Sequence, residues 1–215
     1  MTEIFFGNPP KYIKNWIIAH SKPRLTELCF TAEEANSSVK LQKQGSAVIE
    51  GFNGLEYKIN NNGWTSYAIG STITLANIGD KVYMRAVAAG NSRMGATYGG
   101  YHQFFMTGKI AASGNVNTLL NPDPNAEVSL AGKYFCYSGM FNGCTSLTQA
   151  PELPATTLAD FCYSNMFKGC SSLTQAPELP ATTLANKCYS YMFSGCSSLT
   201  QAPELPATKL ADFCY

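Results

Sequence analysis

Hydrophobic and polar residues alternate in short stretches between residues 25 and 121, and polar turn residues separate the stretches. This pattern is typical of half-buried β-strands. The expected strands are Glu27–Thr31, Ser38–Gln42, Leu55–Asn60, Gly63–Tyr67, Thr72–Leu75, Lys81–Ala86 and Gln103–Thr107. The run Asn60-Asn61-Asn62-Gly63 predicts a hairpin turn between two of them. About seven strands at this spacing predict an antiparallel β-sandwich, immunoglobulin-like in the broad sense.

The remaining part of the chain, 122–215, repeats itself. Cysteines recur with a step of 26 residues at positions 136, 162, 188 and 214, and a second series with the same step lies at positions 144, 170 and 196. Three copies, which begin at Cys136, Cys162 and Cys188, are identical at 20 of 26 positions. Such repetition indicates units that stack, because no single unit can bury its own apolar face.

Each unit has apolar residues at intervals of four. Leu158, Cys162 and Met166 form one row, and the residues that directly follow each of them form a second row. Together the two rows predict the apolar face of an amphipathic helix. Thr157 and Asp160 are spaced as a capping box at the start of this helix. A glycine follows where the helix should end, and the proline-rich remainder is expected to be extended. Each unit is therefore predicted to be a helix followed by a short strand.

Residues 1–24 form a separate N-terminal segment. Its two prolines favour a helix start, and the apolar residues after them fall on one face of a short amphipathic helix. The residues expected to anchor it to another protein are Phe5, Phe6, Pro9, Pro10, Tyr12, Ile13, Trp16 and Ile17. With an anchor at 1–24, a sandwich at 25–121 and repeats at 122–215, the predicted fold class is α+β.

Composition excludes several classes of protein. Apolar residues are 45% of the chain and charged residues 13%, so a packed core is expected and disorder is not. The net charge is +1 without a run of like charge, which disfavours nucleic acid as a partner. No apolar run is long enough for membrane insertion, and the first ten residues lack the basic start and apolar run of a signal peptide.

The eight cysteines admit three interpretations: a disulfide framework, a zinc site or packing. No secretion signal accompanies them, and their spacing lacks the short pairs that zinc sites favour. On a helix, two cysteines eight residues apart would be about 12 Å apart, too far to bond. We favour buried free thiols, with Cys144, Cys170 and Cys196 above one another as a structural ladder, and disulfides are the alternative.

Catalytic chemistry finds little support in the sequence. The two histidines, His20 and His102, do not lie near a nucleophile motif, and no metal-binding or phosphate-loop motif is present. One glutamate recurs per unit, so these residues form a row and not an acid–base pair. The chain is therefore predicted to be a binding or structural protein without enzyme activity, metal or cofactor.

Polar residues that recur once per unit are candidates for a ligand-binding face, because repeat proteins often bind along their extended surface. The candidates are Thr148, Gln149, Glu152, Thr174, Gln175, Glu178, Thr200, Gln201 and Glu204. The expected ligand is a protein or a glycan. Recent duplication without a selected surface is the alternative explanation of the same pattern.

A resemblance to a known family rests on the repeats. The run Cys-Tyr-Ser-Tyr-Met-Phe-Ser-Gly-Cys-Ser-Ser-Leu-Thr at 188–200 resembles the cysteine-containing leucine-rich repeats of BspA-type bacterial surface proteins. The resemblance covers about residues 131–215 and implies a right-handed solenoid of the leucine-rich-repeat type. Related repeats occur in phages of gut bacteria, often behind a β-rich N-terminal part.

The resemblance and the N-terminal segment together imply a structural virion protein of a bacteriophage, such as a head fibre, tail fibre or decoration protein. Residues 1–24 are expected to bind other virion proteins of the capsid or tail. The repeats are expected to bind a protein or glycan of the bacterial host surface, and a homo-oligomer is compatible with this role. The alternative is a secreted or surface-anchored bacterial adhesin.

The sequence stops at Cys214-Tyr215, two residues into a fourth copy. Terminal repeats need a cap to stay soluble. We therefore expect the full-length chain to continue with more copies, or a partner to cover this end.

Overall fold

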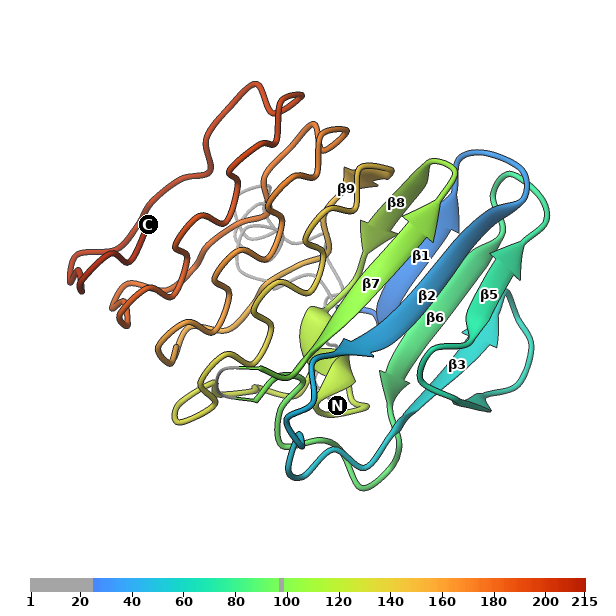
Figure 1. Cartoon of the computed structure of the whole chain (residues 1–215), viewed down its shortest axis with the longest axis horizontal. Coiled ribbons are helices and arrows are strands. Elements are labelled where there is room, and N and C mark those ends of the chain that lie inside the picture. Colours follow the sequence, from blue (N-terminus) through green and yellow to red (C-terminus); the bar gives the residue numbers. More distant parts are fainter. Residues whose placement is uncertain (1–24, 97–98) are drawn as a thin grey trace, which may run out of the picture.

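The computed structural model describes residues 25–96 and 99–215, and its elements are nearly all strands (Figure 1). In this part of the chain they are β1 (Leu28–Ala32), β2 (Ser37–Gln44), β3 (Leu55–Ile59), β4 (Thr65–Tyr67), β5 (Thr72–Leu75), β6 (Lys81–Ala86), β7 (Tyr101–Thr107), β8 (Ile110–Ser113), the short 3-10 helix η1 (Val116–Leu119) and β9 (Leu147–Gln149). Each strand expected before residue 108 is present within a few residues of its expected position. The predicted N-terminal helix lies outside the described residues.

The nine described strands form two sheets that pack face to face, and all of them except β9 precede η1. One has the order β4-β3-β6-β1-β8-β9 and the other the order β5-β2-β7. Alternate residues of each strand point between the sheets, as in β1, where Leu28 and Phe30 are fully buried. The Phe30 ring lies 4.9 Å from that of Phe104 in the opposite sheet, centre to centre. Cys29 is also buried, but on the other face of β1, where it pairs with Tyr83 of β6.

The hairpin expected from the asparagine run connects β3 to β4. Leu55 pairs with Tyr67 across this hairpin. Asn60 adopts a positive φ of 52°, a conformation that asparagine tolerates better than most residues. Its side-chain oxygen accepts a hydrogen bond from the backbone of Lys81, which ties the turn to β6. The prediction of this turn is confirmed.

The order of the strands departs from the immunoglobulin arrangement. In that arrangement the first strand lies beside the second in the same sheet. Here β1 lies in the larger sheet between β6 and β8, and β7 takes the place beside β2. The short loop 33–36 carries the chain from one sheet to the other, and Asn36 turns it with a φ of 58°. The immunoglobulin-like prediction is wrong in topology, because alternation along a strand does not specify its neighbours.

The predicted helices of the repeat region are absent from the described residues, so the α+β class is wrong. Each segment expected to be helical is a series of β-turns, with bonds such as Met140 N to Tyr137 O at 3.2 Å. Every fourth residue has a positive φ, which lies between 56° and 75° for Phe161, Asn165 and Gly169. A right-handed helix does not contain such residues.

A period of four residues explains why the sequence favours a helix. Two buried rows at this interval fit one helical face over a short segment, and they fit a ribbon of turns equally well. Gly139, Asn165 and Tyr191 occupy the corner of a turn with a positive φ, and not the outer face of a helix. Asp160 does not close a capping box: its carboxylate accepts a hydrogen bond from Asn186 N of the next unit at 3.0 Å.

Successive units stack, and backbone hydrogen bonds join them. Tyr137 N donates to Cys162 O at 2.8 Å, and Tyr163 N donates to Cys188 O at 2.9 Å. These bonds recur at alternate residues of the turn segment, while the residues between them form the turns. The backbones of successive units therefore run side by side (Figure 1), and equivalent rings stack, as Tyr137 does on Tyr163 and Phe141 on Phe167.

The sandwich forms the first layer of this stack. Phe104 N of β7 donates to Met140 O of the first unit at 2.7 Å. The Phe104 ring lies 5.1 Å from Phe141, and the ladder continues to Phe167 and Phe193 at 5.4 and 5.9 Å. One continuous hydrophobic core includes residues of both regions. The edge strand β7 is thus covered by the repeats, which protects it from pairing with other chains.

The larger sheet also extends into the repeats. β9 of the first unit pairs in parallel with β8, with Leu147 opposite Ile110. Among the described residues, the equivalent segments of the next two units are not strands. Because the units consist of turns and lack the helix–strand coil, the right-handed leucine-rich-repeat solenoid is not the fold of this region.

Candidate ligand-binding groove

The proposed ligand-face residues lie in the segment that follows the turns of each unit. In the second unit, Leu173, Pro177 and Leu179 are buried, and Gln175 and Glu178 between them are exposed. Proline lacks a backbone N–H and fixes φ, so these segments stay extended. This arrangement presents one glutamine and one glutamate per unit to solvent.

A groove of about 540 Å³ joins the faces of the first two units. Its polar residues include Gln149, Glu152, Gln175 and Glu178. Its apolar floor is formed largely by prolines, namely Pro151, Pro154, Pro177 and Pro180. The structure thus brings four of the nine predicted residues together, whereas Gln201 and Glu204 of the third unit are exposed outside this groove.

The carboxylate of Glu152 is in the most distinctive environment of this groove. Burial raises the pKa of Glu152, and a hydrogen bond from the backbone of Gly114 opposes that rise. The Glu152 backbone also bridges to Asn115, just before η1. The groove is therefore attached directly to the end of the sandwich.

The threonines of the predicted face differ from one another. Thr148 is half-buried, and its hydroxyl bonds to the Glu33 carboxylate at 2.7 Å and to Ile110 O at 3.1 Å. Thr174 is exposed and donates to Thr148 O at 3.3 Å, and Thr200 is exposed as well. Thr148 therefore links the first unit to the sandwich, and its hydroxyl is not available as a separate ligand contact.

The cysteines of the predicted ladder lie in the interior of the stack. Cys144, Cys170 and Cys196 are buried, and each thiol donates to a carbonyl 3.1 Å away in the preceding layer, at Phe104, Phe141 and Phe167. All eight cysteines are free. Burial raises the pKa of the Cys144 thiol to about 12, so the protonated donor is the stable form at neutral pH.

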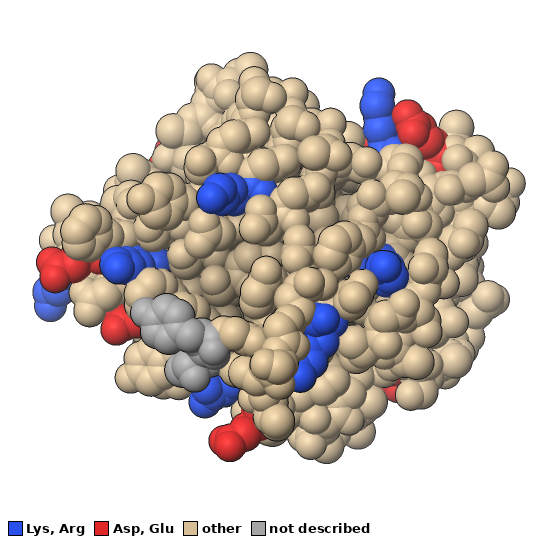
Figure 2. Space-filling model, viewed as in Figure 1, with Lys and Arg blue, Asp and Glu red and all other residues tan. Residues whose placement is uncertain are grey.

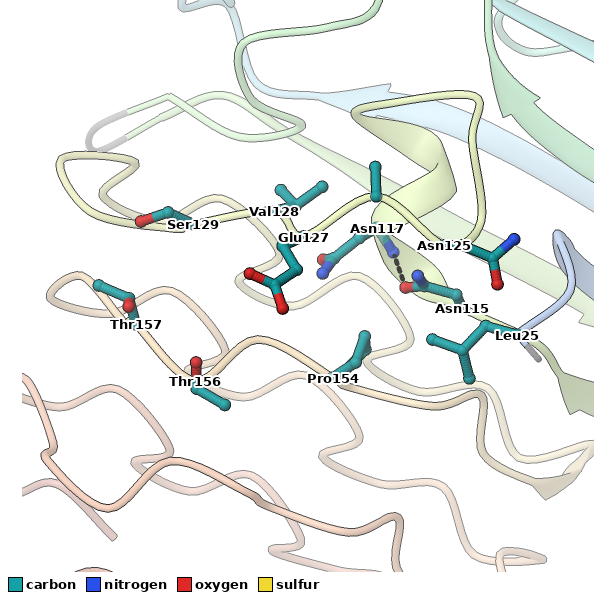
Figure 3. Close-up of a pocket in the computed structure, with 11 residues that line it drawn as sticks. Leu25, Asn115, Asn117, Asn125, Glu127, Val128, Ser129, Pro154, Thr156 and Thr157 are labelled. Carbon is teal, nitrogen blue, oxygen red and sulfur yellow. Dashed lines mark hydrogen bonds between the residues drawn. The ribbon is translucent and has the colours of Figure 1, made fainter. Parts of the chain in front are cut away.

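A second pocket, which sequence reasoning missed, adjoins the groove. It shares Leu25, Pro154 and Thr156 with the groove and continues to Asn117 and Glu127 (Figure 3). The asparagines that line it are Asn115 just before η1, Asn117 in η1 and Asn125 in the 121–130 segment. Their density was the available signal, but asparagine is equally common in turns.

Other candidate chemistry is not assembled by the described residues. His102 is buried, its Nδ1 lies 2.9 Å from Met94 O, and burial lowers its pKa. His20 and all eight predicted anchor residues lie outside the described part of the chain. Within that part, no group of three or more His, Cys, Asp or Glu side chains is placed to hold a metal ion. None of its helices is long and apolar enough to cross a membrane.

Charged side chains are sparse on the face that Figure 2 shows. The lysines and arginines visible there lie apart from one another across a largely uncharged surface. Such a face offers scattered single charges and not a basic patch.

Comparison with known proteins finds no family model, no curated protein and no solved structure that matches this chain.

Proposed function

We propose that this chain is a non-enzymatic binding protein of a bacteriophage particle, and that its repeat region recognises a protein or glycan of the bacterial host surface. The observation that carries the proposal is the groove that gathers Gln149, Glu152, Gln175 and Glu178 on a proline floor. A concave site with an apolar floor and a few convergent polar groups is the usual form of a ligand site.

The regular spacing of the units favours an extended ligand. Equivalent side chains recur at the interval of the ring ladder, 5.4 Å between Phe141 and Phe167 and 5.9 Å between Phe167 and Phe193. One glutamine and one glutamate per unit therefore form a repeated set of acceptors and donors along the stack. A ligand with repeating units can use this set several times, which raises its avidity.

The phage setting rests on the sequence. The 188–200 run resembles repeats found in phages of gut bacteria, and residues 1–24 carry the apolar side chains proposed to bind capsid or tail proteins. In this arrangement the N-terminus anchors the chain as a head fibre, tail fibre or decoration protein. The stack, joined rigidly to the sandwich, then faces the host.

Mass spectrometry of purified phage particles and of host envelope fractions tests the setting. Recovery of the protein from intact particles is the expected result. Recovery from envelopes alone would instead make the chain an exported bacterial adhesin, and the proposed role of residues 1–24 would be wrong.

A cell-binding assay tests the groove. The purified chain is labelled and incubated with cells of the bacterium on which the particles grow. The double variant Gln175→Ala, Glu178→Gln should reduce binding about tenfold or more, because one amide side chain and one carboxylate charge of the same unit are lost. The exposed Glu50, which is outside the groove, supplies the matched control Glu50→Gln. Equal binding of the two variants would remove the groove from the proposal.

A further inference from the structure

The pocket beside the groove has the features of a built site. It has a volume of about 550 Å³ and lies between η1, the 121–130 segment and the end of the first unit. Figure 3 shows side chains from all three parts turned toward the same space. Three separate parts of the chain, all packed on one core, therefore hold the walls of the pocket in place.

A buried amide lies on one wall of the pocket. Asn117 is 2% exposed, and its side-chain oxygen accepts a hydrogen bond from the Tyr137 hydroxyl at 3.0 Å. No described residue accepts a hydrogen bond from its Nδ2 group. The neighbouring Asn115 is satisfied, since it donates to Pro124 O and accepts from Asn117 N. Asn117 is thus an oriented donor at a position where a ligand can supply the acceptor.

The other walls supply acceptors and an apolar surface. The Glu127 carboxylate points into the pocket, and Thr156 approaches from the opposite side (Figure 3). Glu127 forms no ion pair with a described residue. Leu25 and Pro154 supply apolar surface beside these polar groups, whereas the Val128 side chain points away from them and packs against the core (Figure 3).

The polar and apolar groups that line the pocket indicate which class of ligand it can bind. Among the described residues, no lysine, arginine or histidine lines the pocket, so an anionic ligand would lack a counter-charge. One carboxylate is too few for a calcium site, which takes several oxygen ligands including carboxylates. An amide donor, a carboxylate acceptor and a hydroxyl beside an apolar surface match the neighbouring hydroxyls and the C–H face of a sugar ring. A neutral saccharide therefore fits these groups best.

We propose that this pocket binds one sugar unit of a neutral, linear polysaccharide, and that the polymer continues along the groove over Pro154 and Thr156. The inference rests on the proposed binding function of the groove and names its ligand class. Asn117 donates to a ring hydroxyl, Glu127 accepts from one or two others, and Leu25 with Pro154 contacts the C–H face.

Binding of the purified chain to an array of neutral and anionic glycans tests the proposed class of ligand. Dissociation constants are then measured by calorimetry for the neutral glycan that is retained best. Glu127→Gln and Thr156→Val change exposed pocket side chains and should each weaken binding, Glu127→Gln by about tenfold. Glu50→Gln and Thr182→Val are the matched controls, since Thr182 is the exposed equivalent of Thr156 one unit later and lies outside both cavities. Unchanged melting temperatures confirm that the variants are folded.

The outcomes separate this inference from the proposed function. Binding to neutral glycans that both pocket variants weaken, with the controls unchanged, is the expected result. Binding that falls with Glu178→Gln in the groove but not with Glu127→Gln would leave the groove function standing and overturn the pocket inference. Retention of anionic glycans only, or of no glycan, would also overturn it. If no glycan is retained, loss of host-cell binding by the groove variants would indicate a protein ligand.

Discussion

The sandwich and the repeat region share one hydrophobic core but reach it with different backbones. Sandwich strands point alternate residues inward, so a period of two describes them. The repeats point two adjacent residues of every four inward, as in Cys162-Tyr163 and Met166-Phe167. In the sandwich the backbone bonds follow pairs of strands, whereas each repeat divides them between its own turns and the next unit. The comparison shows that the spacing of apolar residues along the chain predicts which residues are buried. It predicts less reliably whether the backbone around them forms strands, turns or a helix.

Alkaline pH should destabilise the chain mainly through the repeats, because one buried cysteine is in the sandwich and the other seven are in the repeats. Burial raises the pKa of Cys136 and Cys144 from 9.0 to about 12. In the unfolded chain these thiols ionise near pH 9, so the folded state binds more protons above that pH. Their contribution is intact below pH 9 and is lost as the pH rises toward 12, by about 1.4 kcal/mol per pH unit for each thiol.

Urea unfolding followed by circular dichroism at pH 8 to 11 measures this loss. Cys136→Ala should reduce the slope of unfolding free energy against pH by the share of one thiol. A slope that is the same in the variant and in the unchanged protein would show that Cys136 is not buried as described.

Substitution of Phe141, whose ring lies where the sandwich meets the repeats, tests whether the two regions unfold as one cooperative unit. Phe141→Ala deletes a fully buried ring that stacks between Phe104 and Phe167, and should cost about 3–5 kcal/mol. Hydrogen exchange followed by mass spectrometry should show both regions losing protection together. Phe105→Ala is the control, since its ring is 39% exposed on the outer side of β7. Loss of protection in the repeats alone would show that the sandwich folds independently.

Substitution of one glycine in each region compares the turns of the repeats with the β3–β4 hairpin of the sandwich. Gly169 has a φ of 75°, and an added Cβ would meet its nearest neighbour, Gly143 Cα, at 3.6 Å, an ordinary contact. The cost of Gly169→Ala is therefore conformational and should be about 1–2 kcal/mol. Gly63→Ala in the β3–β4 hairpin should change stability by less than about 0.5 kcal/mol, because that Cβ meets nothing within 4 Å and φ is not positive. Equal effects in thermal unfolding would contradict the assignment of the turns.

A substitution at Tyr191 distinguishes a ribbon of turns from a helix in the repeats, because the two structures predict stability changes of opposite direction. Tyr191 is 69% exposed and has a φ of 55°, at the corner that Gly139 occupies in the first unit. Tyr191→Gly should relieve the left-handed strain and stabilise the chain by up to about 1 kcal/mol. The same change inside a helix would destabilise it by about 0.5 kcal/mol. A lower melting temperature for the variant would favour the helix.

Sequence alone located much of the candidate site, but not its full extent. The unit step placed Gln149 and Gln175 at equivalent exposed positions, and the structure brings them into one groove. Thr148 was predicted as a ligand contact, yet its hydroxyl bonds to Glu33 and Ile110. That contact joins residues far apart in the chain, so no local pattern reveals it.

The sequence by itself determined the strands before residue 108, the hairpin at Asn60 and the 26-residue step of the stack. These features depend on side-chain polarity and turn chemistry, which act over a few residues. Only the tertiary structure decided that β1 lies beside β6, that the repeats are turns, and that Asn117 and Glu127 share a pocket. Those outcomes depend on hydrogen bonds and packing between distant segments, and a four-residue burial period is compatible with more than one way of making them.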